Sequence, residues 1–276
     1  MNHQIAGNPW LPRRAVIQTI RPEIDRVATY ELQLIDGGAE TFRFAPGQFN
    51  MLYVPGAGEI AISISDGCRG TLHHTIRTVG RVTEAFARLE PGTTVGLRGP
   101  YGSAWPIEDC RGQDVLIVAG GIGLAPLRPF IQAIFERRAE FGRVMLLYGS
   151  RDPDTLLFVD QYAGWNAAEI ETYTTVDRAG MHWAGNVGVV PSLIDRLAHL
   201  HPQRTRVVMC GPEVMMRYSV RSALQRGITR EHLWLSLERN MQCAVGLCGH
   251  CQFAGNFACK DGSVLRYDKV RDMMAL

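Results

Sequence analysis

The chain has 276 residues, of which 46% are hydrophobic and 20% charged, a composition that allows one large domain or two modest ones with a full core. Lysine and arginine number 29 and aspartate and glutamate 27, so the formal net charge is only +2. Because this balance is even and no block of basic residues stands out, the sequence argues against a nucleic-acid-binding protein.

The N-terminal stretch and the apolar runs bear on the location of the protein. The stretch MNHQIAGNPWLPRRAV lacks the apolar core of a secretion signal, and the sequence has no run of about 18 apolar residues. We therefore expect an intracellular, cytoplasmic protein without a transmembrane segment. Since thiols stay reduced in that compartment, the seven cysteines are not expected to form a disulfide framework.

Residues 1–107 have the pattern of short strands. RRAVIQTI, VATYELQLI, GQFNMLYV, EIAISIS, LHHTIRTV and TTVGLRG are β-branched or alternating, and Gly, Pro and Asp separate them. The stretch VTEAFARL, residues 82–89, is the one helical pattern among them. Many short strands at nearly regular spacing predict an antiparallel β-barrel.

The hydrophobic period changes over residues 108–236. The run VLIVA is continuously apolar, as expected for a strand covered on both faces, and it leads through GGIGLAP into a helical pattern. RVMLLYG, EIETYTTV, RVVMCG and HLWLSL then alternate with helical patterns around 154–165, 189–200 and 212–226. This alternation predicts a five-stranded parallel sheet with helices on both faces.

Three glycines follow the first predicted parallel strand. Gly120, Gly121 and Gly123 lie between the end of that strand and the next helix, where backbone N–H groups and the helix dipole converge on an anion such as a pyrophosphate. Pro126 fits the first turn of the helix. Because the pattern is not G-x-G-x-x-G, a plain strand-to-helix turn stays open as the alternative.

Two further strand ends are expected at the same edge of the sheet. Their residues are Gly149, Ser150 and Arg151 after the second strand, and Cys210, Gly211 and Pro212 after the fourth. Arg151 is the cation placed to meet a ribose 2′-phosphate, although a solvated loop arginine fits equally, so the choice between NAD and NADP stays open. Cys210 is a candidate neighbour of a bound nicotinamide. The isolated Cys68 and Cys110 read as structural.

Four cysteines lie close together near the C-terminus. Cys243, Cys248, Cys251 and Cys259 have the spacing C-x4-C-x2-C-x7-C. The first three match the C-x4-C-x2-C spacing of plant-type [2Fe–2S] proteins, and the surrounding glycines let backbone N–H groups turn toward the sulfurs. Zinc sites usually present two close pairs, and His250 has no histidine partner at a suitable spacing. We predict an iron–sulfur cluster, with zinc and free or bridged thiols as alternatives.

With these parts the chain resembles the ferredoxin–NADP reductase superfamily, in which a flavin-binding β-barrel precedes an α/β nicotinamide-binding domain. The motifs that carry the resemblance are AISIS, TVGRVTEAF, GLRGPYG, GGIGLAPLR, CGPEVMM and SLERNMQCAVGLCGHCQ…FACKDGSV. The cluster segment, residues 237–276, makes it most similar to reductase subunits of multi-subunit enzymes. These are the gamma subunits of cytosolic NAD(P)-linked nickel–iron hydrogenases, or sulfhydrogenases, the B subunit of anaerobic sulfite reductase and the electron-transfer subunit of dihydroorotate dehydrogenase.

The resemblance implies FAD and NAD(P)H sites on particular residues. AISIS corresponds to the family's R-x-x-S segment, with Ser63 as the serine. Ile60 stands in the place of the usual arginine, so the flavin phosphates lack one cation. Arg81, in the second flavin segment GRVT, is the candidate to supply that charge. The implied flavin contacts are Ile62, Ser63, Ile64, Ser65, Thr78, Gly80, Arg81, Val82 and Thr83. For the nicotinamide nucleotide, Ala125 joins the strand-end residues.

The implied function is that of an electron-transfer, or diaphorase, subunit. It would pass electrons between NAD(P)H, FAD and the [2Fe–2S] cluster and on to the catalytic subunits of a hetero-oligomeric oxidoreductase. A nickel–iron hydrogenase is favoured, because dihydroorotate dehydrogenase partners tend to have a longer gap before the last cysteine than the seven residues here. The alternatives are a sulfite reductase or dihydroorotate dehydrogenase subunit, a stand-alone ferredoxin or oxygenase reductase, and a redox-sensing or zinc-stabilised binding protein.

Overall fold

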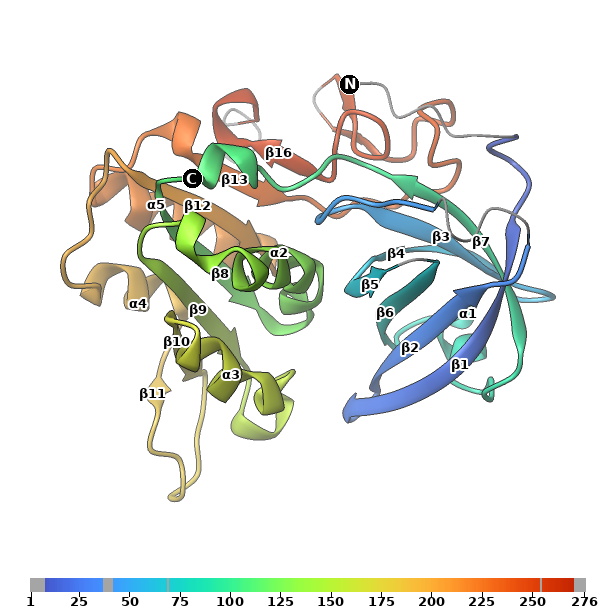
Figure 1. Ribbon diagram of the computed structural model, residues 1–276, viewed down its shortest axis with the longest axis horizontal. Helices are drawn as coiled ribbons and strands as arrows, with labels where there is room; N and C mark the ends of the chain where they lie inside the picture. The colour runs from blue at the N-terminus through green and yellow to red at the C-terminus, as the bar shows by residue number, and fades with distance from the viewer. Residues whose placement is uncertain (1–7, 37–41, 69, 254, 271–276) are drawn as a thin grey trace. The chain divides into compact units, whose positions relative to one another are not determined.

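The computed structural model describes residues 8–36, 42–68, 70–253 and 255–270 (Figure 1). Its internal contacts divide the chain into two compact units. Unit 1 comprises the described residues up to Ala104 together with Glu238–Ser263, and unit 2 runs from Trp105 to Leu237 and continues from Val264. The cysteine segment is thus grouped with the barrel, whereas the division expected from the sequence, at residues 108 and 237, stays a prediction.

Unit 1 is built on a seven-stranded antiparallel sheet with the order β4-β3-β7-β1-β2-β6-β5, which confirms the predicted barrel. The strands are β1 (Arg13–Ile24), β2 (Val27–Leu34), β3 (Phe49–Val54), β4 (Gly58–Ser63), β5 (Asp66–Cys68), β6 (Thr71–Arg77) and β7 (Thr94–Tyr101). The predicted helical stretch forms α1 (Arg81–Phe86). Strand β4 also contacts β6, which brings the two sides of the curved sheet together.

The core of the barrel follows from the alternation of its strands. Along β2, the side chains of Tyr30, Leu32 and Leu34 are buried and pack with Leu52 and Leu97 from β3 and β7 in one cluster. Helix α1 joins this core through Phe86, whose ring meets that of Tyr30 edge to face at 5.4 Å. The alternating pattern of the sequence therefore fixes which face of each strand is inside.

Unit 2 contains the expected parallel sheet. The strands are β8 (Asp114–Gly120), β9 (Val144–Ser150), β10 (Ile170–Val176), β12 (Thr205–Cys210) and β13 (Leu233–Ser236), in the spatial order β10-β9-β8-β12-β13. Every residue of β8 and β9 is buried, as their continuous apolar runs predicted. Two short strands extend the sheet: β11 (Asn186–Val187) beside β10, and β16 (Val264–Arg266), which pairs antiparallel with β13.

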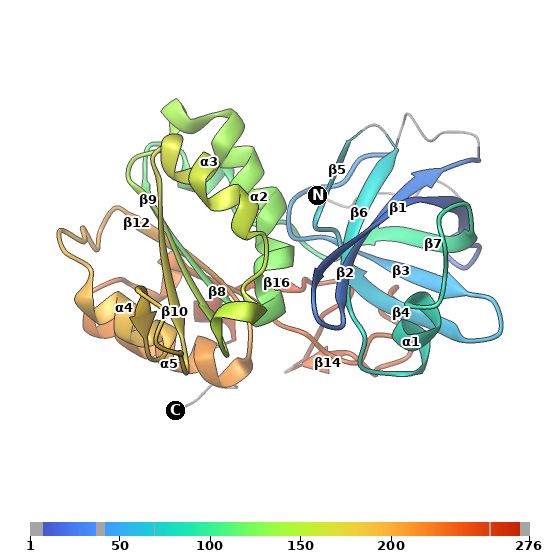
Figure 2. The ribbon, with the colours of Figure 1, turned by 90° about the horizontal axis from the view of Figure 1, so that it is seen from below.

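The helices cover both faces of this sheet. They are α2 (Leu124–Glu136), α3 (Tyr162–Ala167), α4 (Val190–Arg196) and α5 (Glu213–Gln225). Figure 2 shows α2 and α3 on one face and α4 and α5 on the other. The chain runs outward from β8 to β10 and then crosses back to β12, so right-handed crossovers place the two helix pairs on opposite faces. The reversal of direction lies between β8 and β12, which is where such sheets bind ligands.

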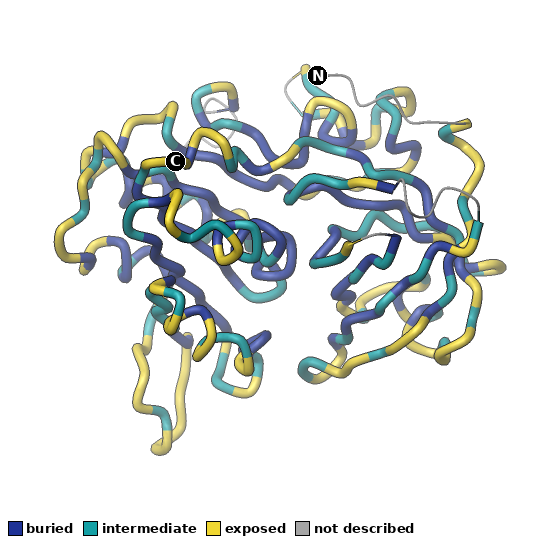
Figure 3. Tube along the Cα trace, viewed as in Figure 1, coloured by how far each residue is buried: buried dark blue, intermediate teal, exposed yellow. Residues whose placement is uncertain are grey.

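The cysteine segment of unit 1 has little regular structure. Its described residues, 238–253 and 255–263, form two short paired strands, β14 (Gln252–Phe253) and β15 (Asn256–Phe257). This segment packs on the outer side of the barrel, where its residues form a cluster with side chains of β3 and β7. The members of this cluster are Phe49, Met51, Tyr101, Ala244, Cys251, Ala258 and Cys259. Figure 3 shows the central strands of both sheets as buried and the loops at their edges as exposed. Within the part of the chain that the structure describes, no helix has the length and apolarity needed to cross a membrane.

Candidate functional site

The predicted nucleotide residues lie at the carboxyl ends of three neighbouring strands of unit 2. Gly120 ends β8, Ser150 ends β9 and Cys210 ends β12, and these three strands are adjacent in the sheet. The other predicted residues occupy the turns that follow: Gly121, Gly123 and Ala125 at the start of α2, Arg151 after β9, and Gly211 and Pro212 before α5. The fold brings the set to one edge, and its role in binding stays a prediction.

Two glycines in the turn after β8 are required by the geometry. Gly121 has φ of +53°, a conformation that residues with a Cβ atom rarely adopt. A Cβ atom at Gly123 would lie 2.4 Å from the carbonyl oxygen of Cys210, so only glycine lets the start of α2 approach the end of β12. The turn can therefore direct backbone N–H groups outward at the reversal point of the sheet.

A tyrosine that the sequence did not single out holds this turn. The Tyr148 hydroxyl donates to the carbonyl oxygen of Gly121 at 3.2 Å and accepts a hydrogen bond from the N–H of Leu157 at 3.2 Å. Burial raises the pKa of Tyr148 to about 12, so the phenol stays protonated and can donate. The available signal was a tyrosine hydroxyl inside a buried and mostly apolar strand.

The two side chains predicted at the end of β9 behave differently. The Ser150 hydroxyl is bound to the carbonyl oxygen of Thr155 at 2.8 Å and lies 2.7 Å from its hydroxyl, so Ser150 shapes the following turn. Arg151 is exposed, and within residues 8–36, 42–68, 70–253 and 255–270 its guanidinium has no hydrogen-bond or ion-pair partner. Of the two, Arg151 is the one with donors available to a ligand.

The two predicted flavin segments lie close together in unit 1. Ser63 ends β4, and Gly80 precedes α1, where the Thr83 hydroxyl accepts a hydrogen bond from the N–H of Gly80 at 3.0 Å. The Arg81 side chain extends toward β4. Its Nη2 atom lies 3.6 Å from the position that a Cβ atom on Gly58 would occupy. Among the described residues Arg81 has no acidic partner, so its charge is available to an anion at this turn. The other predicted flavin residues, Ile62, Ile64, Ser65, Thr78 and Val82, lie along the same two segments.

A buried histidine supports the end of β4. His74 on β6 is fully buried, and its Nδ1 atom lies 3.0 Å from the carbonyl oxygen of Ser63 while its Nε2 atom lies 3.2 Å from Nδ2 of Asn50. Because a carbonyl oxygen only accepts, Nδ1 carries the proton and Nε2 accepts from Asn50. Burial lowers the pKa of His74 to about 4, so the ring is neutral near pH 7. The sequence analysis did not identify His74 and Asn50, whose hydrogen bonds fix the backbone at Ser63.

The four cysteines of unit 1 lie in a loop whose backbone N–H groups face the sulfurs. The Cys243 Sγ atom accepts from the N–H groups of Val245 and Leu247 at 3.4 Å and from that of Cys248 at 3.5 Å. The Cys259 Sγ atom accepts from the N–H of Gly246 at 3.3 Å. Ala244 has φ of +62°, which turns the following amides back toward the sulfur. This arrangement stabilises negative charge on sulfur.

The pKa directions of the thiols agree with that geometry. Burial alone would raise the pKa of Cys243, but hydrogen bonds from three backbone N–H groups lower it overall. The N–H of His250 and then that of Cys243 lower the pKa of Cys248. Burial, followed by the neighbouring sulfur of Cys251, raises the pKa of Cys259. The backbone N–H groups therefore shift Cys243 and Cys248 toward the thiolate form that binds metals.

The sulfurs are arranged as two pairs. The Sγ atoms of Cys251 and Cys259 lie 3.3 Å apart, and the thiols of Cys243 and Cys248 interact directly with each other. Among the described residues, no three His, Cys, Asp or Glu side chains converge closely enough to hold a single metal ion. A tetrahedral zinc site needs four ligands around one point, whereas the two irons of a [2Fe–2S] cluster each take two thiolates. The residues present fit the binuclear cluster better.

Comparisons with known proteins match two stretches of this chain to family models. Residues 117–221 match the family model of the oxidoreductase NAD-binding domain, and residues 238–271 match that of the iron–sulfur cluster binding domain of dihydroorotate dehydrogenase B. Sulfhydrogenase 1 subunit gamma from Pyrococcus furiosus is 35% identical, with 83% of this chain and 81% of that protein covered. Sulfhydrogenase 2 subunit gamma from the same organism is 31% identical over 94% of this chain and 96% of that protein.

Other relatives extend the comparison. A probable dihydroorotate dehydrogenase B (NAD(+)) electron transfer subunit from Methanocaldococcus jannaschii is 31% identical, with 94% of this chain and 92% of that protein covered. Among solved structures, an NADH-dependent reduced ferredoxin–NADP oxidoreductase has a TM-score of 0.76 at 24% identity, covering 98% of this chain and 94% of that one. A ferredoxin–NADP reductase from Neisseria gonorrhoeae with bound FAD and NADP has a TM-score of 0.70 at 23% identity, covering 80% and 96%. These two structures share the fold.

Proposed function

The chain belongs to the oxidoreductase family that contains the sulfhydrogenase gamma subunits and the electron transfer subunits of dihydroorotate dehydrogenase B. From this premise we propose that it passes electrons between NAD(P)H, FAD and a [2Fe–2S] cluster as one subunit of a larger enzyme. The cysteine loop carries this proposal. Paired sulfurs that accept hydrogen bonds from backbone N–H groups suit an anionic, thiolate-bound redox centre better than a zinc ion or free thiols.

Each remaining site supplies one function to this relay. The glycine turn after β8 and the exposed Arg151 would bind the phosphates of the nicotinamide nucleotide. The Gly80 turn and Arg81 would bind the flavin phosphates, and Ser63, held by His74, would lie at the flavin ring. A flavin is required between the other two groups because a nicotinamide gives up two electrons together whereas a [2Fe–2S] cluster accepts one at a time. No acid or base side chain is needed for this transfer.

The test of the relay is an anaerobic titration of the purified chain with NADPH and then NADH. Visible absorption follows the flavin, and electron paramagnetic resonance follows the cluster. We expect flavin bands that bleach on reduction and a rhombic signal from the reduced cluster, and the nucleotide that acts at lower concentration identifies the physiological donor. A colourless chain that contains zinc would overturn the proposal in favour of a zinc-stabilised binding protein.

The flavin site can be tested separately through Arg81. An Arg81→Ala chain should retain less FAD after gel filtration, because the cation proposed to meet the flavin phosphates is gone. Arg88→Ala is the matched control, since Arg88 is also exposed and lies just after the same helix. Full FAD occupancy in the Arg81 variant would remove this residue from the site.

For the partner we propose the catalytic and electron-transfer subunits of a cytoplasmic nickel–iron hydrogenase, which the two sulfhydrogenase gamma subunits favour. The match of residues 238–271 to the dihydroorotate dehydrogenase B cluster domain favours the second candidate, the electron transfer subunit of that enzyme. The tagged chain, purified anaerobically from its own cells, should bring down nickel and show hydrogen-dependent reduction of NAD(P)+. Dihydroorotate-dependent reduction of NAD+ without nickel would select the second candidate instead.

A further inference from the structure

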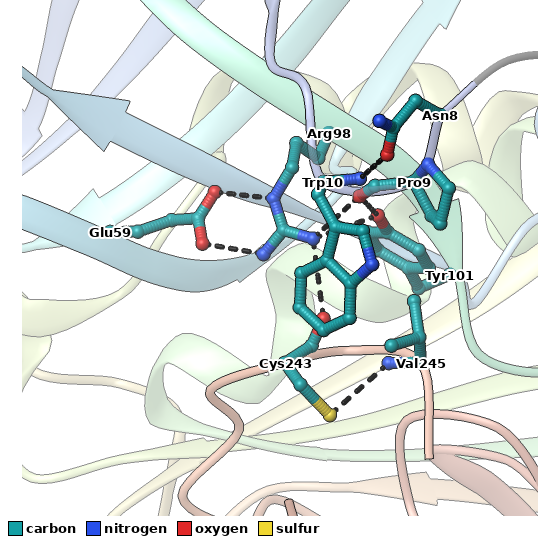
Figure 4. Close-up of polar contacts among 8 residues, drawn as sticks. All are labelled: Asn8, Pro9, Trp10, Glu59, Arg98, Tyr101, Cys243 and Val245. Carbon is teal, nitrogen blue, oxygen red and sulfur yellow. Dashed lines mark hydrogen bonds and ion pairs between the residues drawn. The ribbon is translucent and has the colours of Figure 1, made fainter. Parts of the chain in front are cut away.

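Arg98 connects the cysteine loop to the strand that carries the predicted flavin serine. It lies on β7, its side chain is only 5% exposed, and its polar contacts reach three separate segments of unit 1 (Figure 4). The rings of Trp10 and Tyr101 lie 5.8 and 5.7 Å from its guanidinium carbon and shield it from solvent. A buried arginine with this many partners is costly unless each contact is well made.

One edge of the guanidinium faces β4. Its Nε and Nη2 atoms donate to the two carboxylate oxygens of Glu59 at 2.8 and 2.5 Å, a bidentate ion pair. Glu59 lies on β4 four residues before Ser63 and next to Gly58, which Arg81 approaches. The Glu59 hydrogen bonds raise the pKa of Arg98, so the guanidinium stays charged at every working pH. The charge is therefore permanent and tied to the flavin strand.

The other edge faces the cysteine loop. The Nη1 atom donates to the carbonyl oxygen of Cys243 at 3.2 Å, to that of Pro9 at 2.8 Å and to the hydroxyl of Tyr101 at 3.2 Å. Cys243 is the residue whose Sγ atom accepts three backbone N–H groups. Fixing its carbonyl group fixes the peptide from which the turn at Ala244 begins, and so fixes the direction of those N–H groups.

The two charges of the pair are not equivalent for the cluster. The carboxylate binds the edge of the guanidinium that faces away from Cys243, and the Glu59 side chain is 22% exposed where that of Arg98 is 5% exposed. Solvent therefore screens the negative charge more than the positive one. Since reduction adds an electron to an already anionic cluster, a net positive charge at this place favours the reduced form.

We propose that Arg98 is a positioning residue that holds Cys243 in the geometry required for cluster binding and raises the reduction potential of the cluster, and that Glu59 limits this rise. The inference rests on the proposed function, because it concerns the cluster that the four cysteines would hold. It adds a specific structural link between the flavin strand β4 and the first cysteine.

The experiment compares cluster content and midpoint potential in single variants, with titrations monitored by electron paramagnetic resonance. Arg98→Gln should lower both the iron and sulfide content and the potential. Glu59→Gln should raise the potential, because it leaves the cation uncompensated. Arg98→Lys should have a midpoint potential close to that of the wild-type chain but a lower iron and sulfide content, because a lysine keeps the charge without the forked geometry. The double variant with Gln at both positions leaves no unpaired buried charge. It should still lose iron and sulfide content, and its midpoint potential should lie between those of the two single Gln variants.

Arg143→Gln is the matched control. Arg143 also makes a bidentate pair, with Glu171 at 2.6 and 2.7 Å, and its Nη1 atom also donates to a backbone carbonyl, that of Ala198 at 2.8 Å, but it lies in unit 2. This control should leave cluster content and potential unchanged. Potential shifts of the same sign in Arg98→Gln and Glu59→Gln, or changes no larger than those of Arg143→Gln, would overturn the inference.

A measurement on the metal-free chain separates this inference from the proposed function. If the wild-type chain binds no iron after reconstitution, the proposed function fails, but the role of Arg98 in holding the loop is still measurable by amide hydrogen exchange. In the metal-free chain, Arg98→Gln should speed exchange at Val245, Leu247 and Cys248 roughly tenfold or more relative to Arg143→Gln, because the tether of their loop is lost. Equal exchange in the two variants would overturn the positioning role.

Discussion

The carboxyl edge of the unit 2 sheet and the cysteine loop of unit 1 are both places where we propose that a negatively charged group binds, but they are supported differently. The sheet edge rests on β8 and β12, whose parallel register continues to the pair of Ala119 and Cys210. The described residues of the loop over 238–263 have little regular structure, and the loop depends on side chains of β3 and β7. Support by many backbone hydrogen bonds tolerates most single changes, whereas support by a few side chains does not.

A change at one proposed ligand in the loop should therefore abolish cluster binding while the sheet edge keeps its structure. Cys251→Ser removes a buried thiol that lies 3.3 Å from that of Cys259, so one of the two sulfur pairs is lost and nearly all iron should be absent. Iron and sulfide analysis measures this effect, and nucleotide binding to unit 2 should be unchanged. Cys68→Ser, at an exposed cysteine outside the loop, serves as the control. Full cluster content in the Cys251 variant would exclude this cysteine as a ligand.

A change at the sheet edge should instead weaken nucleotide binding and leave the cluster unaffected. In a Gly123→Ala chain the new Cβ atom would lie 2.4 Å from the backbone oxygen of Cys210, which cannot move aside as a flexible side chain could. We expect a loss of roughly 3 kcal/mol in the free energy of unfolding of unit 2 and weaker NAD(P)H binding, with cluster content unchanged. Denaturant titration and fluorescence binding assays measure the two effects. Gly164→Ala, where a Cβ atom would meet nothing within 4 Å, should be nearly neutral.

Acid should weaken the barrel through His74. Its pKa in the folded state is about 4, below the value of 6.5 expected when unfolded, so its contribution to stability is complete above pH 6.5 and is lost as the pH falls toward 4. Between pH 6.5 and pH 5 this amounts to about 2 kcal/mol. A His74→Gln chain cannot take up that proton and should show a flatter acid limb in its stability profile. Parallel profiles for the two chains would mean that His74 is not buried in the neutral form.

The sequence predicted those parts of both regions that depend on neighbours in the chain. The barrel strands, the five parallel strands and the four cysteines each have a local pattern, either a hydrophobic period or a fixed spacing. The strand β16 was not predicted, because its three residues pair with β13 only after the irregular loop has returned to unit 2. Arg98 lies within the quoted motif GLRGPYG, yet its contact with Cys243 joins residues 145 positions apart. No local pattern encodes that pairing, nor the contact between His74 and Ser63.

The smallest effect should come from Tyr148, a side chain that tethers the glycine turn at the sheet edge. Tyr148→Phe removes the hydroxyl that donates to the carbonyl of Gly121 and accepts from the N–H of Leu157, and leaves both backbone groups without this partner. Because the strands still hold the edge, the expected cost is only about 1 kcal/mol in stability, with a modest rise in the NAD(P)H dissociation constant. Thermal unfolding and binding titrations measure both quantities, with Tyr162→Phe as a control hydroxyl that donates to Leu157 without reaching the glycine turn. A loss in nucleotide binding as large as that of Gly123→Ala would show that the sheet edge, like the cysteine loop, depends on individual side chains.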